Sequence, residues 1–286
     1  MRICYSSDFH GQISLYDQFD DLVHAQKPNL VILGGDMLPD GDPDDPITPQ
    51  VAFVHDEYMR RINSWQNAAP GLAVACVLGN HDWICSRMAL QNYHDAGRIV
   101  LLDHRQAWHY DGVAFLGYSK SPPTPHWVKD LERLDLPDSP LPASGGTVWD
   151  PGAQCVFEAR PEEHFGTQPS IETELAAAAR IEGPWIFVCH APPHGTKLDR
   201  LPSVEYPIGS RAVRDFIQSR QPMCALHGHV HESPGFTGSH IDHIGRSLCV
   251  NPGQSLDNLH AVLFDSDDPA GTLRHTVFAE APASRP

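Results

Sequence analysis

Basic residues are scarce in this sequence, and long apolar runs are absent. Its 286 residues include 20 lysines and arginines against 36 aspartates and glutamates, for a formal net charge of −16. So acidic a chain offers no broad basic face to long nucleic acid or to an anionic membrane, although bound cations can reverse the sign locally and admit a small anion. No run approaches the roughly 20 apolar residues of a membrane span, and the N-terminus carries no signal-peptide pattern. We therefore expect a cytoplasmic protein with no membrane partner, and leave a homo-oligomer open.

Cysteine motifs are also lacking. The seven cysteines show no C-x-x-C spacing, so the pattern of an iron–sulfur cluster or of a four-cysteine zinc site is missing. Five of them lie in or beside apolar, strand-like segments, namely Cys4, Cys76, Cys189, Cys224 and Cys249. We interpret these five as buried, reduced thiols, which suits a reducing compartment.

Apolar strand-like segments alternate with helical patterns along the chain. Apolar residues recur with helical spacing over 14–26, 51–67, 170–181 and 209–219, which predicts four helices. Strands, some together with the loop that follows them, are expected in the segments 2–7, 29–36, 71–82, 97–103, 108–119, 184–190, 223–231, 240–245, 247–253, 259–265 and 275–281, with Asp111-Gly112 as a hairpin turn. Strand–helix alternation followed by strands indicates an α/β protein, in which helices cover the sheets and functional loops follow the carboxyl ends of strands.

Residues 121–169 interrupt this alternation. They are rich in proline and glycine, with scattered aromatic residues and little periodicity, and they are too numerous for an ordinary connection. We predict an irregular surface insertion, which is either a lid over a site or a segment without a role. Because no internal repeat divides the chain, residues 1–286 are expected to form one domain that contains this insertion.

Five polar clusters each follow an apolar strand. They are Asp8-Phe9-His10-Gly11, Gly35-Asp36, Gly79-Asn80-His81-Asp82, His190 and Gly228-His229-Val230-His231. One such cluster alone is commonly a helix cap or a hydrogen-bonded histidine, but five that follow strands can converge on one edge of a sheet. Their pooled oxygen and nitrogen donors suit manganese, iron, zinc or nickel. Seven donors are too many for one zinc ion, and they fit two metal ions.

The same clusters carry a family resemblance. The blocks D-x-H, G-D, G-N-H-[DE], H and G-H-x-H occur in that order from Asp8 to His231, and this pattern resembles the calcineurin-like metallophosphoesterases. The resemblance implies a four-layer α/β/β/α sandwich of two mixed β-sheets flanked by helices. It also implies two divalent metal ions per chain, for which Mn²⁺, Fe²⁺/Fe³⁺, Zn²⁺ and Ni²⁺ are the candidates. One small departure is Cys189, which precedes His190 where the family often has glycine.

The resemblance further implies a role for each residue. The first metal would be held by Asp8, His10 and His231, the second by Asn80, His190 and His229, and Asp36 would bridge both. A hydroxide that bridges the two ions would attack phosphorus. His81 would act as general acid on the leaving oxygen. It would be oriented by Asp82 or, because adjacent side chains rarely bond directly, by a more distant carboxylate.

Three further features have weaker signals. His190 is followed by APPHGTKLD, which resembles the H-x-P-P-x-G-x-x-D stretch of phosphodiesterase-like members, so His194 either contacts substrate or is a surface histidine in a rigid turn. The aspartate-rich loop Pro39–Pro46 is interpreted as a solvated turn. His227 alternates with His229 and His231 but is assigned no metal. We interpret it as a packed or solvent-facing residue, with support of the site from behind as the alternative.

Together these features predict a metal-dependent phosphoester hydrolase. The leading hypothesis is a phosphodiesterase that acts on a small substrate, which the APPHGTKLD segment and the acidic charge favour. A phosphomonoesterase of the same fold is the alternative within this class, and a non-catalytic metal-binding scaffold is the alternative from another class. The presence of all seven ligand positions together with His81 argues against the scaffold.

Overall fold

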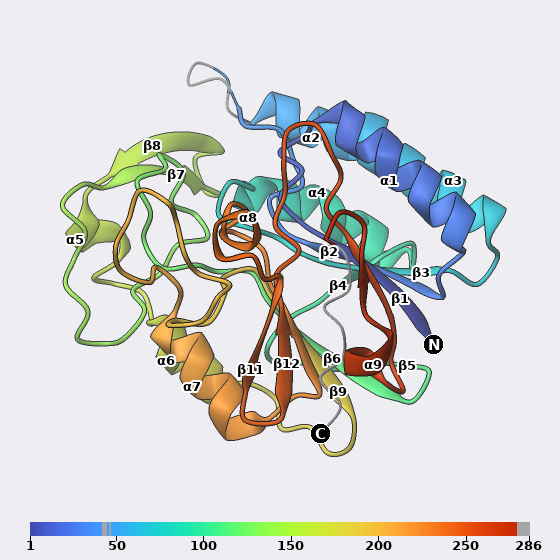
Figure 1. Cartoon of the computed structure of the whole chain (residues 1–286). Helices are drawn as coiled ribbons and strands as arrows, with labels where there is room; N and C mark the ends of the chain where they lie inside the picture. Colours follow the sequence, from blue (N-terminus) through green and yellow to red (C-terminus); the bar gives the residue numbers. More distant parts are fainter. Residues whose placement is uncertain (42–44, 46, 279–286) are drawn as a thin grey trace.

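The computed structural model describes residues 1–41, 45 and 47–278 of the chain, and its elements are labelled in Figure 1. The strands are β1 (Arg2–Ser6), β2 (Leu30–Gly34), β3 (Ala73–Val77), β4 (Val100–Leu101), β5 (Trp108–Tyr110), β6 (Val113–Tyr118), β7 (Gly146–Asp150), β8 (Cys155–Ala159), β9 (Trp185–Cys189), β10 (Cys224–Leu226), β11 (Ile241–Ile244), β12 (Ser247–Val250), β13 (Val262–Asp265) and β14 (Arg274–His275). The helices are α1 (Ile13–Gln26), α2 (Thr48–Phe53), the π-helical turn η1 (Val54–Tyr58), α3 (Met59–Ala68), α4 (Ile84–Asp95), α5 (Pro161–His164), α6 (Ile171–Ala176), α7 (Arg211–Arg220), α8 (Ser233–Thr237) and α9 (Pro269–Thr272).

Two six-stranded mixed sheets form the centre of the molecule. The first has the strand order β14-β13-β1-β2-β3-β4, and the second has the order β11-β12-β10-β9-β6-β5. In the first sheet β1 to β4 run parallel, and β13 pairs antiparallel with both of its neighbours, β1 and β14. In the second sheet β6, β9, β10 and β12 run parallel, while β5 and β11 pair antiparallel at its edges. Parallel strands need both faces covered, and here both are.

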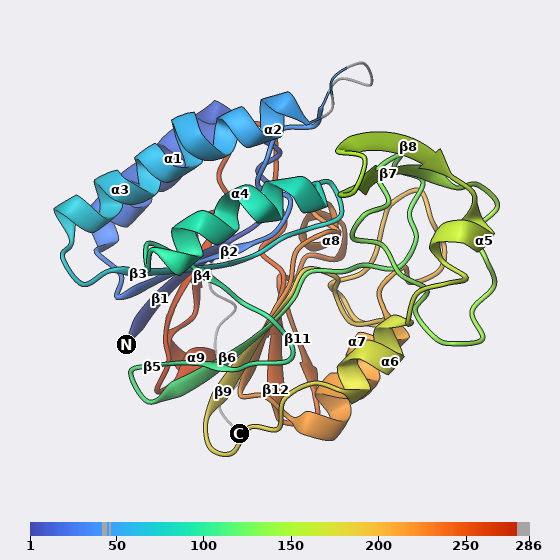
Figure 2. The same ribbon diagram turned by 180° about the vertical axis from the view of Figure 1, so that it is seen from behind.

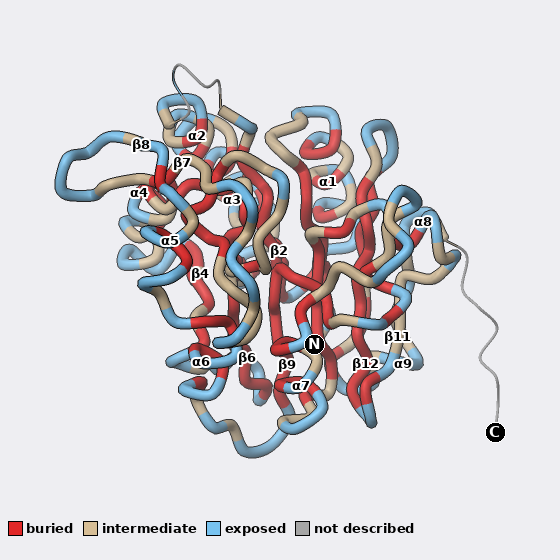
Figure 3. Tube along the Cα trace, turned by 90° about the vertical axis from the view of Figure 1, so that its left-hand side faces the viewer, coloured by how far each residue is buried: buried red, intermediate tan, exposed pale blue. Residues whose placement is uncertain are grey.

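Side-chain alternation divides each central strand between two cores. On β1, Ile3 and Tyr5 enter the core between the two sheets, where they join Phe115 and Ile186 of the second sheet. Cys4 lies on the other face of β1 and joins the core beneath the helices. Because apolar side chains are buried on both faces, these strands read as continuous apolar runs in the sequence. Figure 3 shows the buried segments running through the centre of the molecule.

Helices cover the two outer faces. Leu15, Phe19 and Val23 of α1 pack with residues of α3 and α4 on the first sheet. On the second sheet, α6 and α7 supply residues such as Leu175 and Phe216. Figures 1 and 2 show α1 and α3 on one side of the molecule and α6 and α7 on the other. The expected α/β class and the four-layer sandwich are confirmed.

Several elements differ from the sequence prediction. The helix expected over 51–67 is divided by η1, α4 was not predicted, and the helix expected over 170–181 ends at Ala176. The insertion 121–169 is not wholly irregular, because it contains the β7–β8 hairpin and α5. The last strand is limited to β14, and residues 279–281 of the expected segment lie outside the described residues.

The hairpin turn at Asp111-Gly112 is confirmed. β5 and β6 pair Tyr110 with Val113, and the two residues between them have φ of 48° and 78°, as a two-residue hairpin loop requires. Among the helices of the described ranges, none combines the length and the apolar character needed to cross a membrane.

Candidate metal centre

The polar clusters of the sequence meet at one edge of the two packed sheets. The loops after β1, β2 and β3 come from the first sheet, and the loops after β9 and β10 come from the second. In chain order they carry Asp8, His10, Asp36, Asn80, His190, His229 and His231. Because parallel strands place their carboxyl ends at the same edge, the packing of the sheets brings residues that are more than 200 positions apart together.

Asp36 and His190 make the contact that joins the two sheets at this edge. His190 Nδ1 lies 2.9 Å from the carbonyl oxygen of Gly34, which can only accept, so Nδ1 carries a proton and donates it. In a neutral ring the other nitrogen, Nε2, is then a bare acceptor. It lies 3.1 Å from Asp36 Oδ2 and 3.3 Å from Asn80 Oδ1. Acceptor atoms this close together require a cation, which is either a proton or a metal ion.

Five of the seven candidate ligands fall into two groups that share Asp36. Donor atoms of Asp36, His190 and His229 lie within 4.8 Å of one another, and so do those of Asp8, His10 and Asp36. Both ring nitrogens of His10 are buried without a hydrogen-bond partner, and the His231 ring centroid lies 5.9 Å from that of His10. Facing carboxylates, unpartnered imidazole nitrogens and no thiolate form a donor set that fits divalent manganese, iron, zinc or nickel.

Four of the candidate ligands have a left-handed backbone. The angle φ is 62° at Asp8, 47° at His10, 52° at Asp36 and 67° at His229. These four are half of the eight non-glycine residues with positive φ in the described ranges. Such conformations cost on the order of 1–3 kcal/mol each and persist where the surrounding structure fixes them. Their concentration at this edge is typical of a functional site.

Two motif glycines leave room for ligand side chains. A Cβ atom at Gly79 would overlap the Asp36 carboxylate and the His190 ring, and one at Gly228 would overlap the Asp8 carboxylate. Glycine is therefore required at these two positions by close approach of side chains, and not by a special turn.

Protons and metal ions compete for the same atoms. Burial alone would lower the pKa of His190, but the Asp36 carboxylate outweighs it and raises that pKa to about 9. Burial is likewise outweighed at His10, where Asp40 and Asp36 raise the pKa to about 9. Burial opposes but does not cancel the effect of His190 on Asp36, whose pKa falls well below its usual range. Metal ions bind neutral imidazole, so metal uptake must expel protons from His10 and His190.

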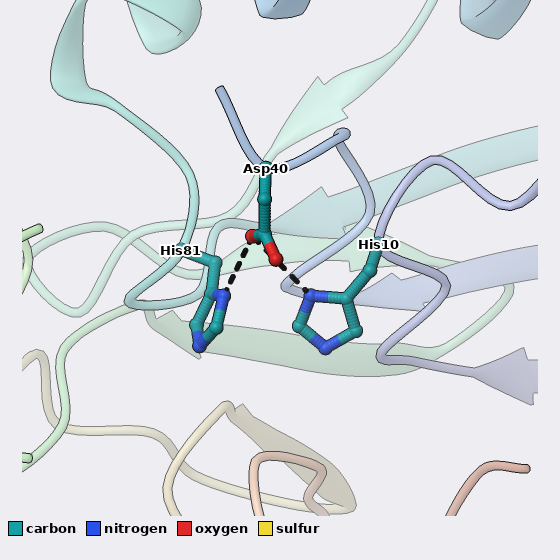
Figure 4. Close-up of side chains that lie close together, drawn as sticks. All are labelled: His10, Asp40 and His81. Atoms are coloured by element: carbon teal, nitrogen blue, oxygen red, sulfur yellow. Dashed lines mark hydrogen bonds and ion pairs between the residues drawn. The ribbon is translucent and has the colours of Figure 1, made fainter. Parts of the chain in front are cut away.

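His81 lies beside these groups with a carboxylate on one ring nitrogen. Its Nδ1 is 2.7 Å from Asp40 Oδ1, which is also 3.8 Å from His10 Nδ1, so that Asp40 lies between the two rings (Figure 4). His126, from the insertion, stacks on the His81 ring with centroids 3.6 Å apart and planes 21° apart. The sequence reasoning missed both Asp40 and His126, because one lies in an acidic loop and the other in a segment without periodicity.

Asp82 does not touch His81 in the structure. Its Oδ2 accepts the backbone N–H groups of Asp36 at 3.0 Å and Gly79 at 2.9 Å, and its Oδ1 accepts that of Leu38 at 3.1 Å. The expectation that Asp82 orients His81 is therefore corrected. Asp82 ties the loop after β2 to the loop after β3, and a more distant carboxylate, Asp40, contacts His81.

The weaker sequence signals have mixed outcomes. In loop Pro39–Pro46, Asp40 is exposed, as a solvated turn requires, but its carboxylate also contacts His81; residues 42–44 and 46 lie outside the described residues. His227 is buried, with Nδ1 3.0 Å from the carbonyl oxygens of both Cys189 and Ala191, so it packs behind His190. The His194 side chain lies 4.0 Å from Asp199, and within the described residues no contact joins it to the candidate ligands.

Comparisons with known proteins agree with this fold and site. The family model for calcineurin-like phosphoesterases matches residues 1–233. One solved crystal structure is 14% identical to this chain, covers 97% of it and 99% of its own chain, and has a TM-score of 0.61. The crystal structure of the protein TT1561 of Thermus thermophilus is 16% identical, covers 96% of this chain and 97% of its own, and has a TM-score of 0.59. No curated protein matches the sequence. The family match bears out the resemblance seen in the sequence, and the two structures support the fold alone.

Asp82→Ala should destabilise the metal-free protein. The substitution leaves three buried N–H groups, on Asp36, Leu38 and Gly79, without their acceptor, and each such loss costs about 1–3 kcal/mol. Urea unfolding should therefore show a loss of at least about 2 kcal/mol. The matched control is Asp21→Ala, at an exposed position of α1, which should change stability by less than about 0.5 kcal/mol. Equal stability of the two variants would contradict the role given to Asp82.

Metal affinity should rise with pH up to about 9. His10 and His190 have pKa values raised to about 9 in the metal-free protein, so below that pH each ion must displace a proton. For each proton released, the affinity for metal should rise by about tenfold per pH unit. Calorimetric titration of Mn²⁺ in buffers of different ionisation enthalpy should report proton release at pH 7 and much less at pH 9.5. Metal binding without proton release at pH 7 would show that the two histidines are not the displaced acids.

Proposed function

Since the chain belongs to the calcineurin-like phosphoesterase family, we propose that it is a phosphodiesterase that uses two metal ions to hydrolyse small phosphodiesters. Metal-dependent hydrolysis of phosphoesters is the activity of this family. The number of ions and the preference for diesters are the proposal. The observation that carries it is the pair of donor groups that share Asp36, with His81 beside them.

We assign the first ion to Asp8, His10 and His231 and the second to Asn80, His190 and His229, with Asp36 shared between them. The grouping of donor atoms about Asp36 supports this assignment for five of the seven residues, and the roles of Asn80 and His231 rest on the family pattern. The Gly34 carbonyl leaves His190 Nε2 free for a metal. When bound, the two ions would hold phosphoryl oxygens and lower the pKa of water, so that a nucleophile forms at neutral pH. Asp8 is kept in place by two donors, since Oδ2 accepts the Ser7 hydroxyl and Oδ1 accepts the N–H of His229.

His81 is suited to protonate the leaving oxygen. Burial lowers its pKa, but Asp36 and the hydrogen bond to Asp40 outweigh burial and raise it above the ordinary value. A carboxylate only accepts, so Nδ1 holds a proton toward Asp40 and Nε2 is the atom that gives its proton to the substrate. Burial acts to raise the pKa of Asp40, but the neighbouring His10 and His81 outweigh it and hold that pKa well below the usual range, so Asp40 stays ionised. A non-catalytic scaffold would have no use for this pair.

The cleft beside the residues assigned to the first ion favours a singly charged substrate. Its volume is about 340 Å³, and it is lined by Asp8, His10, Gln12, His231, Glu232, Gln254, Ser255 and Leu256. This lining contains neither lysine nor arginine, and Glu232 adds negative charge. A monoester dianion would lack counter-charge beyond the metal ions, whereas a diester carries one negative charge. The cleft therefore favours a diester, in agreement with the APPHGTKLD segment.

The enzyme should depend on metal and on Asp36. Protein stripped of metal should regain hydrolysis of bis-p-nitrophenyl phosphate when Mn²⁺ is added. Asp36→Ala should lose bound metal and activity together, because Asp36 belongs to both groups; Asp21→Ala should keep both. Metal content by mass spectrometry and initial rates provide the check. Faster hydrolysis of p-nitrophenyl phosphate would favour the monoesterase alternative, and no hydrolysis with any divalent metal would rule out the enzyme.

Asp40→Asn should lower kcat without loss of metal. The substitution removes the carboxylate that raises the pKa of His81, and the active form of His81 is the protonated one. The activity that depends on protonated His81 is present below the pKa of His81 and is lost as pH rises through it. Because the variant lowers this pKa, the basic limb of its kcat profile should move to lower pH. His81→Ala should remove that limb and slow esters with poor leaving groups by about 10²–10⁴-fold. If His81→Ala instead emptied the metal centre, the role of general acid would be wrong.

A further inference from the structure

A second cavity lies beneath the insertion, separate from the candidate ligands. Its volume is about 710 Å³, which lies within the range of small-molecule sites. Its walls come from α4, the end of β6, and the insertion with its β7–β8 hairpin and α5. In Figure 2 the hairpin and α5 lie beyond one end of α4. We call this cavity the cationic pocket, because Arg87, Arg105, Lys120 and Arg133 line it.

The carboxylates near the cationic pocket form no direct ion pair with its three guanidinium groups. Asp130 accepts the backbone N–H groups of Ile84 at 3.0 Å and Trp149 at 2.8 Å. Asp103 accepts the backbone N–H of Arg105, and Glu174 pairs with Lys120. Within the described part of the chain, Arg87, Arg105 and Arg133 have no carboxylate at ion-pair distance. In a protein with a net charge of −16, three unpaired arginines around one cavity need a reason.

Unpartnered polar atoms gather at the same place. Of the thirteen buried side-chain polar atoms without a hydrogen-bond partner in the described ranges, four belong to residues that line this pocket. They are Arg133 Nε, His104 Nε2, Trp149 Nε1 and His164 Nε2, and the two histidines are less than a tenth exposed. A buried polar group without a partner costs about 1–3 kcal/mol, so a ligand that accepts hydrogen bonds would remove an existing cost.

The electrostatics of the pocket point the same way. Burial lowers the pKa of Lys120, and the positive charge of Arg133 lowers it further. The pKa of His164 falls to about 4 through burial and then through Arg133. Positive charge therefore repels positive charge here, and an anion would relieve that repulsion.

The number and type of donors indicate the ligand. Guanidinium groups bind carboxylate and phosphate oxygens in pairs. Three such groups and two imidazoles exceed what the two oxygens of a carboxylate can accept, whereas a phosphate offers three oxygens and a second negative charge. Leu102, Val148, Trp149 and Phe157 add an apolar wall. We propose that the cationic pocket binds a small organic molecule that bears a phosphate group, at a site distinct from the candidate metal ligands.

The pocket lies close to the metal centre through one shared segment. Leu78 N–H donates to Ser119 Oγ at 3.1 Å, and Ile84 N–H donates to Asp130; Ser119, Ile84 and Asp130 all line the pocket. The segment from Leu78 to Ile84 is thus fastened to the pocket wall at both ends, with Asn80 and His81 between them. The phosphate can therefore belong to the leaving group of a longer substrate or to a separate effector, and the chemistry of binding is the same for both.

Binding is tested on metal-free protein with phenylphosphonate, a phosphate analogue that is not hydrolysed. Calorimetric titration should show saturable 1:1 binding, while benzyl alcohol, which lacks the anion, should not bind. Arg105→Gln should weaken binding by about tenfold or more. This variant is decisive because Arg105 is exposed and its side chain makes no hydrogen bond to any other described residue. Arg133→Gln should also weaken binding, but Arg133 Nη1 holds the carbonyl oxygens of Asp130 and Glu132, so its folding is checked first by circular dichroism.

The matched control is Arg246→Gln, which removes an exposed arginine outside the pocket and should bind as the unchanged protein does. Absence of saturable binding, or equal binding by Arg105→Gln and the unchanged protein, would overturn the proposal. Because no metal is present, this result does not depend on the proposed hydrolysis. A protein that binds phenylphosphonate but hydrolyses no phosphodiester with any metal would refute the proposed function and leave the proposed pocket intact.

A second arm separates the two sources of the phosphate. The metal-loaded enzyme and its Arg105→Gln variant are compared on two diesters, one with a neutral leaving alcohol and one whose leaving alcohol carries a phosphate. A KM raised only for the phosphorylated leaving group assigns the pocket to the substrate. If Arg105→Gln leaves the KM of both diesters unchanged but loses phenylphosphonate binding, the pocket is assigned to a separate effector.

Discussion

The contact between Asp36 and His190 is the one on which the site depends. Each residue lies just beyond the end of a strand of a different sheet, and their side chains meet at 3.1 Å with the Asn80 amide oxygen beside them. Because His190 Nδ1 is already committed to the Gly34 carbonyl, this meeting point lacks a donor unless a proton or a metal ion supplies positive charge. The packing of the two sheets and the need for a cation are therefore two aspects of the same geometry. A shift of one sheet relative to the other would separate the ligands as well as the cores.

The surrounding structure holds this arrangement against strain. Asp8, His10 and Asp36 adopt left-handed conformations that the chain would leave if it were free to do so. Asp82 keeps the strained backbone in place by accepting the N–H of Asp36 and the N–H groups of two nearby residues, and Ser7 holds the carboxylate of Asp8. Strain is placed where ligands must converge, and buried hydrogen bonds nearby make the convergence stable.

The sequence could predict residues whose position follows from a strand. Asp36 and His190 come directly after apolar strands, so their convergence follows from parallel-strand geometry, and the four-layer fold follows from the order of the elements together with the family pattern. Asp40 could not be predicted in this way, because an aspartate-rich loop has the same composition whether it is solvated or folded over two histidines. His126 depends on how the insertion folds back onto His81, and a segment without periodicity gives no signal of that path. Asp82 follows His81 in the sequence, but the turn directs its carboxylate to backbone amides, so that the alternative of a more distant carboxylate holds, with Asp40 in that position.

Two places in this acidic chain gather positive charge, and they lie close together. Two divalent ions would bring four charges against the two of Asp8 and Asp36, and the cationic pocket adds three unpaired guanidinium groups. At physiological ionic strength charges are screened over about 8 Å, so a small anion inside either cavity is exposed mainly to the local positive field. A long polyanion would also lie along the acidic surface and would be repelled there. The net charge of −16 therefore favours small phosphoesters over long nucleic acid, in agreement with the substrate class that we propose.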